Sequence, residues 1–141
     1  METIIGRELI DRNGHIFNTS HVLAKVTALY FSASYCPPCK KFTPILAEKY
    51  DEINELTREG LEIILIPSDK TVEVYQDYFK DQPWLSILYE GDLKQTLREK
   101  YNVKTIPTLI FFNELGNIIE REGRLLVQNN TAKEIINRLF S

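Results

Sequence analysis

The sequence predicts an α/β domain in which a central mixed β-sheet carries helices on both faces and starts with an N-terminal β-hairpin. The first observation is a set of three nearly uncharged runs of strand-forming residues, at Val26–Ser32, Leu61–Ile66 and Thr108–Phe112. The second is that amphipathic segments with helical spacing separate these runs. The third is a pair of turn-rich segments, Asp11–Gly14 and Asn113–Asn117, each flanked by apolar residues as in a hairpin. Alternating strands and helices are typical of a sheet covered on both sides.

The N-terminal part is expected to form the hairpin and the first central strand. Apolar residues precede the Asp11–Gly14 turn and follow it; they are Ile4, Ile5, Leu9, Ile10, Ile16 and Phe17. Val26–Ser32 then reads as a strand buried on both faces.

The clearest helix follows Pro38. Its apolar side chains recur at helical spacing, and they are Phe42, Ile45, Leu46, Tyr50, Ile53 and Leu56. Gly60 marks its stop, and Leu61–Ile66 is the second buried strand.

The spacing predicts two further helices at Thr71–Lys80 and Asp92–Tyr101, followed by a third buried strand at Thr108–Phe112. The turn at Asn113–Asn117 leads into Ile118–Arg121, which predicts an antiparallel hairpin. Thr131 with Glu134 three residues on forms a capping box that opens the last helix.

Length and composition limit the classes of function. The 141 residues are enough for one domain, which we assign to residues 1–141 and expect to be monomeric. A net charge of -3 and no Lys/Arg-rich run leave no basic field for nucleic acid. The N-terminus carries no secretion signal and no apolar run reaches membrane-spanning length, so we expect a cytoplasmic protein with no membrane contact.

Cys36-Pro37-Pro38-Cys39 is the motif that carries chemistry. It lies between a buried strand and the first turn of a helix, where two thiols three residues apart can reach disulfide distance. Unpaired N–H groups and the positive end of the helix dipole favour an anion there, so Cys36 is the expected nucleophile. Cys39, one turn further, is the expected resolving thiol. Pro37 and Pro38 cost little at a helix start and keep the loop rigid.

Two alternatives to a redox pair remain. Zinc binding would need His15 and His21 to complete a set of four ligands with the cysteines. Both histidines fit ordinary surface or edge positions better, so no metal is expected. The other alternative is a pair of inert buried thiols.

The segment from Val26 to Arg124 resembles the thioredoxin superfamily, and within it the tryparedoxin and nucleoredoxin group. The matching motifs are Tyr30–Cys39, Phe42-Thr43-Pro44, Tyr78-Phe79, Pro83-Trp84-Leu85 and Ile106–Ile110. Thioredoxins proper typically carry Trp-Cys-Gly-Pro-Cys and an aspartate six residues before the first cysteine, where this chain has a double proline and Tyr30. The resemblance implies a thioredoxin-like fold.

The same resemblance implies the surroundings of the dithiol. Ile106-Pro107 would be a cis peptide beside it, with the backbone of Ile106 pairing to an extended substrate as an added strand. Tyr35, Pro37 and Pro38 would complete the substrate-binding surface. Tyr35 replaces the tryptophan usual in the family, which keeps an aromatic wall and adds a hydroxyl.

Three other residues qualify the resemblance. Ser68 stands where tryparedoxins commonly have a second tryptophan, which bears on recognition of the tryparedoxin thiol cofactor. Asp69 offers either proton transfer near the dithiol or, as we expect, the cap of the helix that opens at Thr71. Trp84 is expected to anchor its loop by packing rather than to contact substrate.

The sequence therefore predicts an enzyme, a thiol-disulfide oxidoreductase that reduces protein or low-molecular-weight disulfides through Cys36 and Cys39. No bound cofactor is expected. An external thiol donor, such as trypanothione, glutathione or a thioredoxin reductase, would reduce the cysteine pair again. A peroxiredoxin is one candidate protein partner. The alternative is a nucleoredoxin-type binding module whose redox state gates a protein contact.

Overall fold

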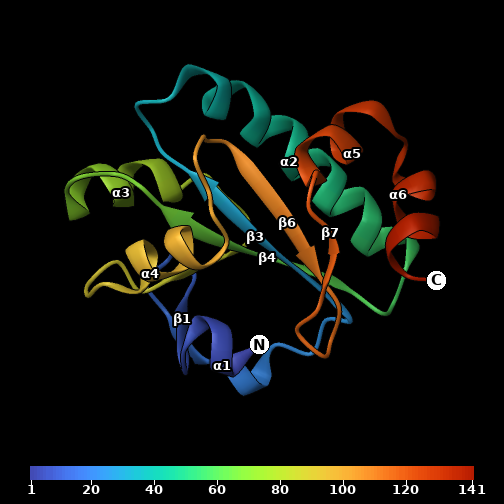
Figure 1. The fold of residues 1–141 in the computed structure, drawn as a ribbon, viewed down its shortest axis with the longest axis horizontal. Helices are drawn as coiled ribbons and strands as arrows, with labels where there is room; N and C mark the ends of the chain where they lie inside the picture. Colours follow the sequence, from blue (N-terminus) through green and yellow to red (C-terminus); the bar gives the residue numbers. More distant parts are fainter.

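A computed structural model of residues 1–141 contains one mixed sheet of seven strands in the order β2-β1-β5-β4-β3-β6-β7 (Figure 1). The strands are β1 (Glu8–Ile10), β2 (Ile16–Asn18), β3 (Val26–Ser32), β4 (Leu61–Pro67), β5 (Leu85–Ile87), β6 (Thr108–Phe112) and β7 (Ile118–Glu120). The central strand β3 runs parallel to β4 and antiparallel to β6. The predicted mixed sheet is confirmed, and β3 and β6 have the predicted bounds.

Helices cover both faces of the sheet, as predicted (Figure 1). They are α1 (Glu2–Ile5), α2 (Pro37–Leu56), α3 (Val72–Phe79), α4 (Leu93–Lys100), α5 (Gly123–Asn129) and α6 (Ala132–Leu139), with a short 3-10 turn at Thr19–His21. Successive residues of β3 point to opposite faces: Tyr30 packs with α2, α3, α5 and α6, whereas Leu29 and Phe31 pack with α1 and α4.

The N-terminal hairpin is confirmed in part. β1 and β2 pair antiparallel around the predicted turn, in which the Asp11 carboxylate accepts the backbone N–H groups of Asn13 and His15. Ile4 and Ile5, however, belong to helix α1 and not to the hairpin. Ile5 is 1% exposed and packs with Leu97 of α4, so burial outweighs the strand preference of two consecutive isoleucines.

Besides α1 and the 3-10 turn, two further elements, β5 and α5, were not predicted. β5 has only three residues. It pairs with β4 in parallel on one side and with β1 antiparallel on the other. α5 has no side-chain cap, whereas α6 has the predicted capping box of Thr131 and Glu134. None of the helices has both the length and the apolarity needed to cross a membrane.

Candidate active site

Three chain segments meet at one end of the sheet. Because β3 and β4 are parallel, the segments that follow Ser32 and Pro67 leave the sheet side by side, and Ser68 N donates to the Ser32 carbonyl at 2.9 Å. Antiparallel β6 begins at this same end, with Thr108 opposite Phe31. Figure 1 shows the loop from β3 into α2 next to the loop that enters β6. This arrangement gathers the dithiol motif, Asp69 and Ile106-Pro107.

Cys36 is the N-cap of α2. Its Sγ accepts the backbone N–H of Cys39 at 3.3 Å, while Pro37 and Pro38 occupy the first helical positions, where no intrahelical donor is needed. Both cysteines are free thiols; Cys36 is 8% exposed and Cys39 is fully buried. A substrate can therefore reach only the first sulfur, and that sulfur has a backbone donor suited to a thiolate.

Ile106-Pro107 is a cis peptide, as the resemblance implied. It lies against the dithiol, since Cys36 Sγ donates to the Ile106 carbonyl oxygen at 3.6 Å. Around this contact Tyr35 is 59% exposed, and Pro37 and Pro38 are exposed as well. The structure thus brings together all seven residues named from the sequence.

Cys39 lies close to the hydroxyl groups of Ser32 and Thr43. Burial raises the pKa of the Cys39 thiol, and the Cys36 side chain raises it further, while hydrogen bonds from Ser32 and the Ala33 backbone act in the opposite direction. Ser32 Oγ lies 2.6 Å from the Tyr78 hydroxyl, which in turn lies 2.9 Å from Thr43 Oγ1. These residues could not be assigned to the site from the sequence, because they come from three separate elements, β3, α3 and α2.

Asp69 has a role different from the one expected. Thr71, not Asp69, caps α3, accepting the Val74 N–H at 3.3 Å. Asp69 is 2% exposed, and its Oδ1 accepts the backbone N–H and the hydroxyl of Ser34 at 2.9 and 2.6 Å. The carboxylate therefore binds the loop that carries Tyr35 and Cys36. The parallel pairing of β3 and β4 causes this contact, and such pairing between distant segments leaves no local signal in the sequence.

Trp84 packs in the core, as expected. It is 1% exposed, meets the rings of Tyr30 and Tyr50 edge-on at 5.9 and 5.7 Å, and donates its indole N–H to Gln82 at 2.9 Å.

The four residues of the zinc alternative do not gather. No group of three or more His, Cys, Asp or Glu side chains is arranged to hold a metal ion. His15 and His21 are both exposed, and His15 pairs with Asp11 at 3.2 Å.

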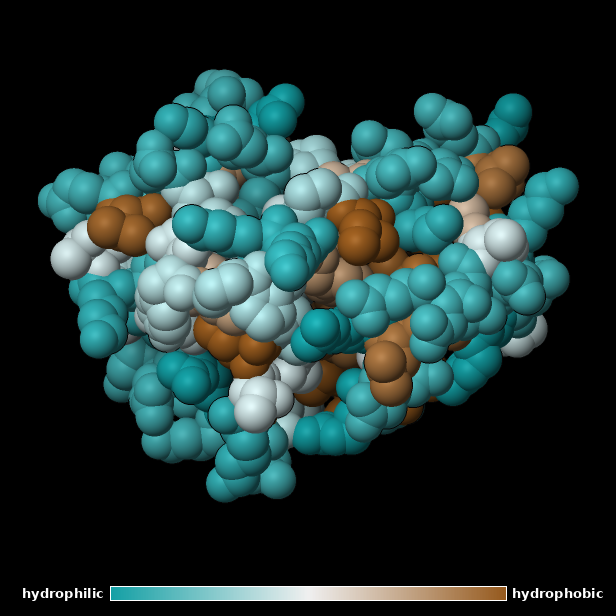
Figure 2. All heavy atoms as spheres, turned by 90° about the horizontal axis from the view of Figure 1, so that it is seen from above, coloured by the Kyte–Doolittle hydropathy of each residue, from teal (hydrophilic) through white to brown (hydrophobic).

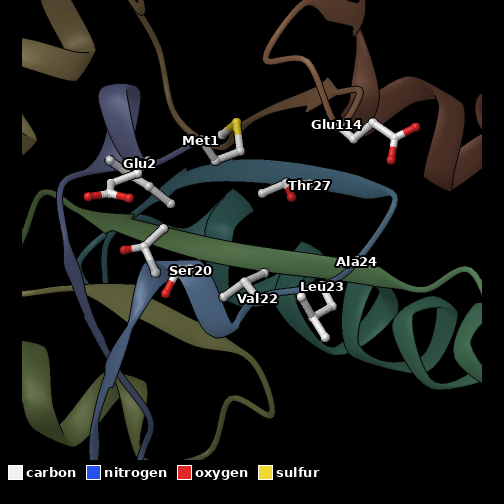
Figure 3. Close-up of a pocket in the computed structure, with 10 residues that line it drawn as sticks. Met1, Glu2, Ser20, Val22, Leu23, Ala24, Thr27 and Glu114 are labelled. Carbon is white, nitrogen blue, oxygen red and sulfur yellow. The ribbon is translucent and has the colours of Figure 1, made fainter.

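A concave feature near the N-terminus does not include the dithiol. It is a cavity of about 400 Å³ lined by residues that include Glu2, Val22, Thr27 and Glu114 (Figure 3). Thr27 lies at the start of β3, whereas Cys36 follows the end of that strand. Seen from the side on which α2 lies, the surface is mainly hydrophilic, with small separate apolar patches (Figure 2). Cys36 therefore lies beyond the opposite end of β3 from this cavity and does not line it.

Comparison with known proteins adds the family context. Residues 24–118 match a family model described as thioredoxin-like. Nucleoredoxin of Mus musculus is 35% identical over 90% of this chain, and the match covers 29% of that protein. Tryparedoxin of Trypanosoma brucei brucei is 36% identical over 84% of this chain and 82% of that protein. The chain spans less than a third of the nucleoredoxins it matches and most of the tryparedoxin.

Solved structures of thioredoxin and tryparedoxin share the fold of this chain. A crystal structure of thioredoxin from Wuchereria bancrofti superimposes with a TM-score of 0.82 and 33% identity, covering 95% of this chain and 94% of that one. A tryparedoxin II complexed with glutathionylspermidine superimposes with a TM-score of 0.78 and 31% identity over 87% of this chain and 86% of that one.

Proposed function

The chain belongs to the thioredoxin superfamily, in its tryparedoxin and nucleoredoxin-like group, and from this premise we propose that it is a thiol-disulfide oxidoreductase working through Cys36 and Cys39. The observation that carries the proposal is the position of Cys36. Its sulfur caps α2, receives the Cys39 N–H, lies beside the Ile106 carbonyl and is the one reachable sulfur of the pair.

The proposed cycle moves two electrons. The Cys36 thiolate attacks one sulfur of a substrate disulfide, the new Cys36–substrate S–S bond forms, and the other substrate sulfur leaves as a thiolate that takes up a proton. Cys39 then attacks Cys36 Sγ, the Cys36–Cys39 bond forms, and the second substrate thiol departs. An external dithiol, or two monothiols, reduces the pair again and becomes oxidised.

The exposed side chains of Tyr35, Pro37 and Pro38 around Cys36 support protein disulfides as substrates, a peroxiredoxin being one candidate. The backbone of Ile106, a partly exposed residue next to cis-Pro107, offers an edge along which an extended chain can pair. A cavity of about 300 Å³ lined by Thr105, Pro107 and Thr108, among others, borders the site and gives room for part of a small thiol. Trypanothione, glutathione and a thioredoxin reductase are the donors to be compared.

Reduction of insulin disulfides tests this proposal, first with dithiothreitol and then with trypanothione or glutathione as donor. The wild-type protein should turn over, and the donor that supports the fastest turnover identifies the physiological class. Cys36→Ser should abolish turnover, whereas Cys39→Ser should accumulate mixed disulfides that a reductant releases. Turnover by Cys36→Ser would refute the assignment of the nucleophile.

The second candidate function is a binding module whose redox state gates a protein contact. Tyr35, an aromatic side chain 59% exposed next to Cys36, favours it because such residues often anchor protein interfaces. A partner bound by wild type should then bind Cys36→Ala equally well. A partner held only through a disulfide to Cys36 would favour the oxidoreductase.

A further inference from the structure

The start of β4 lacks a neighbouring strand on one side. β3 pairs with all of β4, whereas β5 pairs with β4 only from Ile64 onwards. Side chains bind the backbone groups of the unpaired part. The Asn54 amide accepts the N–H of Leu61 at 2.9 Å and donates to the Leu61 carbonyl at 3.0 Å. Glu62 Oε1 accepts the Ile63 N–H at 3.0 Å, so the gap in the sheet is covered by side chains and not by a strand.

A cavity of about 280 Å³ lies beside this gap. Its walls are mainly apolar and include Phe17 of β2, Leu23, and Leu85 of β5. Glu62 and His21 are the two residues of its lining that can carry a charge. Leu23 is 88% exposed and Phe17 is 38% exposed. A ligand that covers these apolar side chains would therefore be stabilised by removing them from water.

Glu62 has one carboxylate oxygen without a partner. Both of its hydrogen bonds, from the Tyr50 hydroxyl at 3.1 Å and from the Ile63 N–H, go to Oε1. Oε2 takes part in no hydrogen bond or ion pair within the chain. It is also absent from the fully buried oxygens that lack a partner, which belong to Ser68 and Asp69. Because Glu62 lines the cavity, this accessible oxygen can bind a ligand there.

We propose that the cavity binds an organic ammonium ion, with the ammonium group on Glu62 and an attached apolar group against Phe17 and Leu23. A partly buried carboxylate without a cation partner is stabilised by such a ligand. A free amine carries this chemistry, and so does a lysine side chain next to an apolar residue in a protein. The site is independent of the proposed function, because Glu62 lies opposite Thr27 at the start of β3, whereas Cys36 follows the end of that strand.

Glu62 carries its negative charge at neutral pH. Burial raises the pKa of this carboxyl to about 6, which is still below pH 7. Burial also raises the pKa of Tyr50, which stays a neutral donor to Glu62. His21 of the 3-10 turn is the other titratable residue of the cavity wall, since β2 and β5 contribute the apolar side chains Phe17 and Leu85.

The charges on the other side of Glu62 also favour a cation. A second, wider cavity borders Glu62 there, and the other charged side chains that line it are Asp51, Glu55, Arg58 and Glu59. Glu59 pairs with Lys25 at 2.8 Å. Together with Glu62, the lining of this cavity carries four carboxylates and one guanidinium, which gives a local excess of negative charge.

Isothermal titration calorimetry at pH 7 tests the site with phenethylammonium as the probe. The wild type should bind this ion at one site. 2-Phenylethanol, which lacks the charge, and ethylammonium, which lacks the ring, should each bind at least about tenfold more weakly. The N-acetylated dipeptide amide of phenylalanine and lysine presents the same two groups on a peptide. Tighter binding of the peptide would identify a protein lysine as the ligand, and tighter binding of phenethylammonium would identify a free amine. Saturable binding of neither overturns the inference.

Glu62→Gln keeps the size of the side chain and removes its charge. It should weaken the binding of phenethylammonium about ten- to hundredfold, because a hydrogen bond between two charged groups is lost. Glu55→Gln is the matched control, since Glu55 lines only the wider cavity, and it should change Kd by no more than about twofold. Equal losses in the two variants overturn the inference. Cys36→Ser should bind the ion as the wild type does, so failure of the proposed disulfide chemistry would leave this site untouched.

The pH dependence of binding tests the role of Glu62 in the unmodified protein. Protonation of Glu62 removes its charge, so Kd for phenethylammonium should rise about tenfold between pH 7 and pH 5. Histidine gains a positive charge as the pH falls through this range, so the titration is repeated with His21→Gln, in which the rise should persist. A Kd that is the same at both pH values, or a rise that disappears in His21→Gln, overturns the inference.

Discussion

Glu62 should make the stability of this protein depend on pH in an unusual direction. The residue lies on β4, where its Oε1 accepts the Tyr50 hydroxyl at 3.1 Å and the Ile63 N–H at 3.0 Å. Burial raises the pKa of this carboxyl from 4.5 to about 6, although both hydrogen bonds act to lower it. The folded protein therefore holds the proton more tightly than the unfolded chain does.

The sign and the magnitude follow from this difference. A raised pKa means that Glu62 contributes stability that is fully present below about pH 4.5 and is lost as the pH rises through about 6. A difference of roughly 1.5 pKa units corresponds to ~2 kcal/mol. Glu62→Gln stays neutral at every pH. Its free energy of unfolding relative to the wild type should therefore rise by ~2 kcal/mol between pH 4 and pH 7.5.

Urea denaturation of both proteins across this pH range measures the effect as a change in the difference between their midpoints. Taking the difference cancels the titration of every other group that the two proteins share. Glu48→Gln, an exposed position on α2, is the control and should show no such trend. A stability difference between Glu62→Gln and wild type that is constant with pH, or that falls as the pH rises, would refute the reasoning.

Two other substitutions probe the packing and the support of the site. Gly123→Ala should destabilise the fold by about 1–3 kcal/mol in urea denaturation, because the added Cβ would lie 2.5 Å from the Leu109 carbonyl oxygen. Gln128→Ala on the same helix is the control and should not destabilise it. Equal stability of Gly123→Ala and the wild type would contradict this close contact. Asp69→Ala should lower stability by about 1–3 kcal/mol and slow the reaction of Cys36 with 5,5′-dithiobis(2-nitrobenzoate), because it removes the acceptor of the two hydrogen bonds that hold Ser34. Asp77→Ala, at an exposed position of α3, is its control, and matching results for the two variants would exclude the supporting role.

The sequence predicts those parts of the fold whose signal is local. β3 and β6 are uncharged runs of mostly apolar residues, and two prolines mark the start of α2, so these three elements could be predicted directly. β5 could not be predicted, because three residues are too few to show an alternating pattern. Its strand conformation depends on pairing with β4, in which Leu85 lies opposite Ile64. α5 begins at a glycine that the neighbouring backbone requires, which is a tertiary constraint on a poor helix former.

The candidate site shows the same division. The two cysteines lie within four residues of each other at the start of one helix, so their geometry could be anticipated from the motif alone. The partner of Asp69 could not, since Ser34 lies 35 positions away and meets it only through the pairing of two parallel strands. Ser32 and Tyr78 are likewise separated by 46 positions. Contacts between residues this far apart in the sequence can be identified only from the three-dimensional structure of the sheet.

The difference in burial between the two thiols would impose an order on the proposed cycle. Cys36 is partly accessible, and its sulfur is held by a backbone donor on one side and lies next to a backbone acceptor on the other, whereas Cys39 has no contact with solvent. An incoming disulfide can therefore meet only Cys36, and Cys39 can react only with a sulfur that Cys36 has already brought to it. In this arrangement burial alone prevents Cys39 from capturing substrates, even when its proton has been removed.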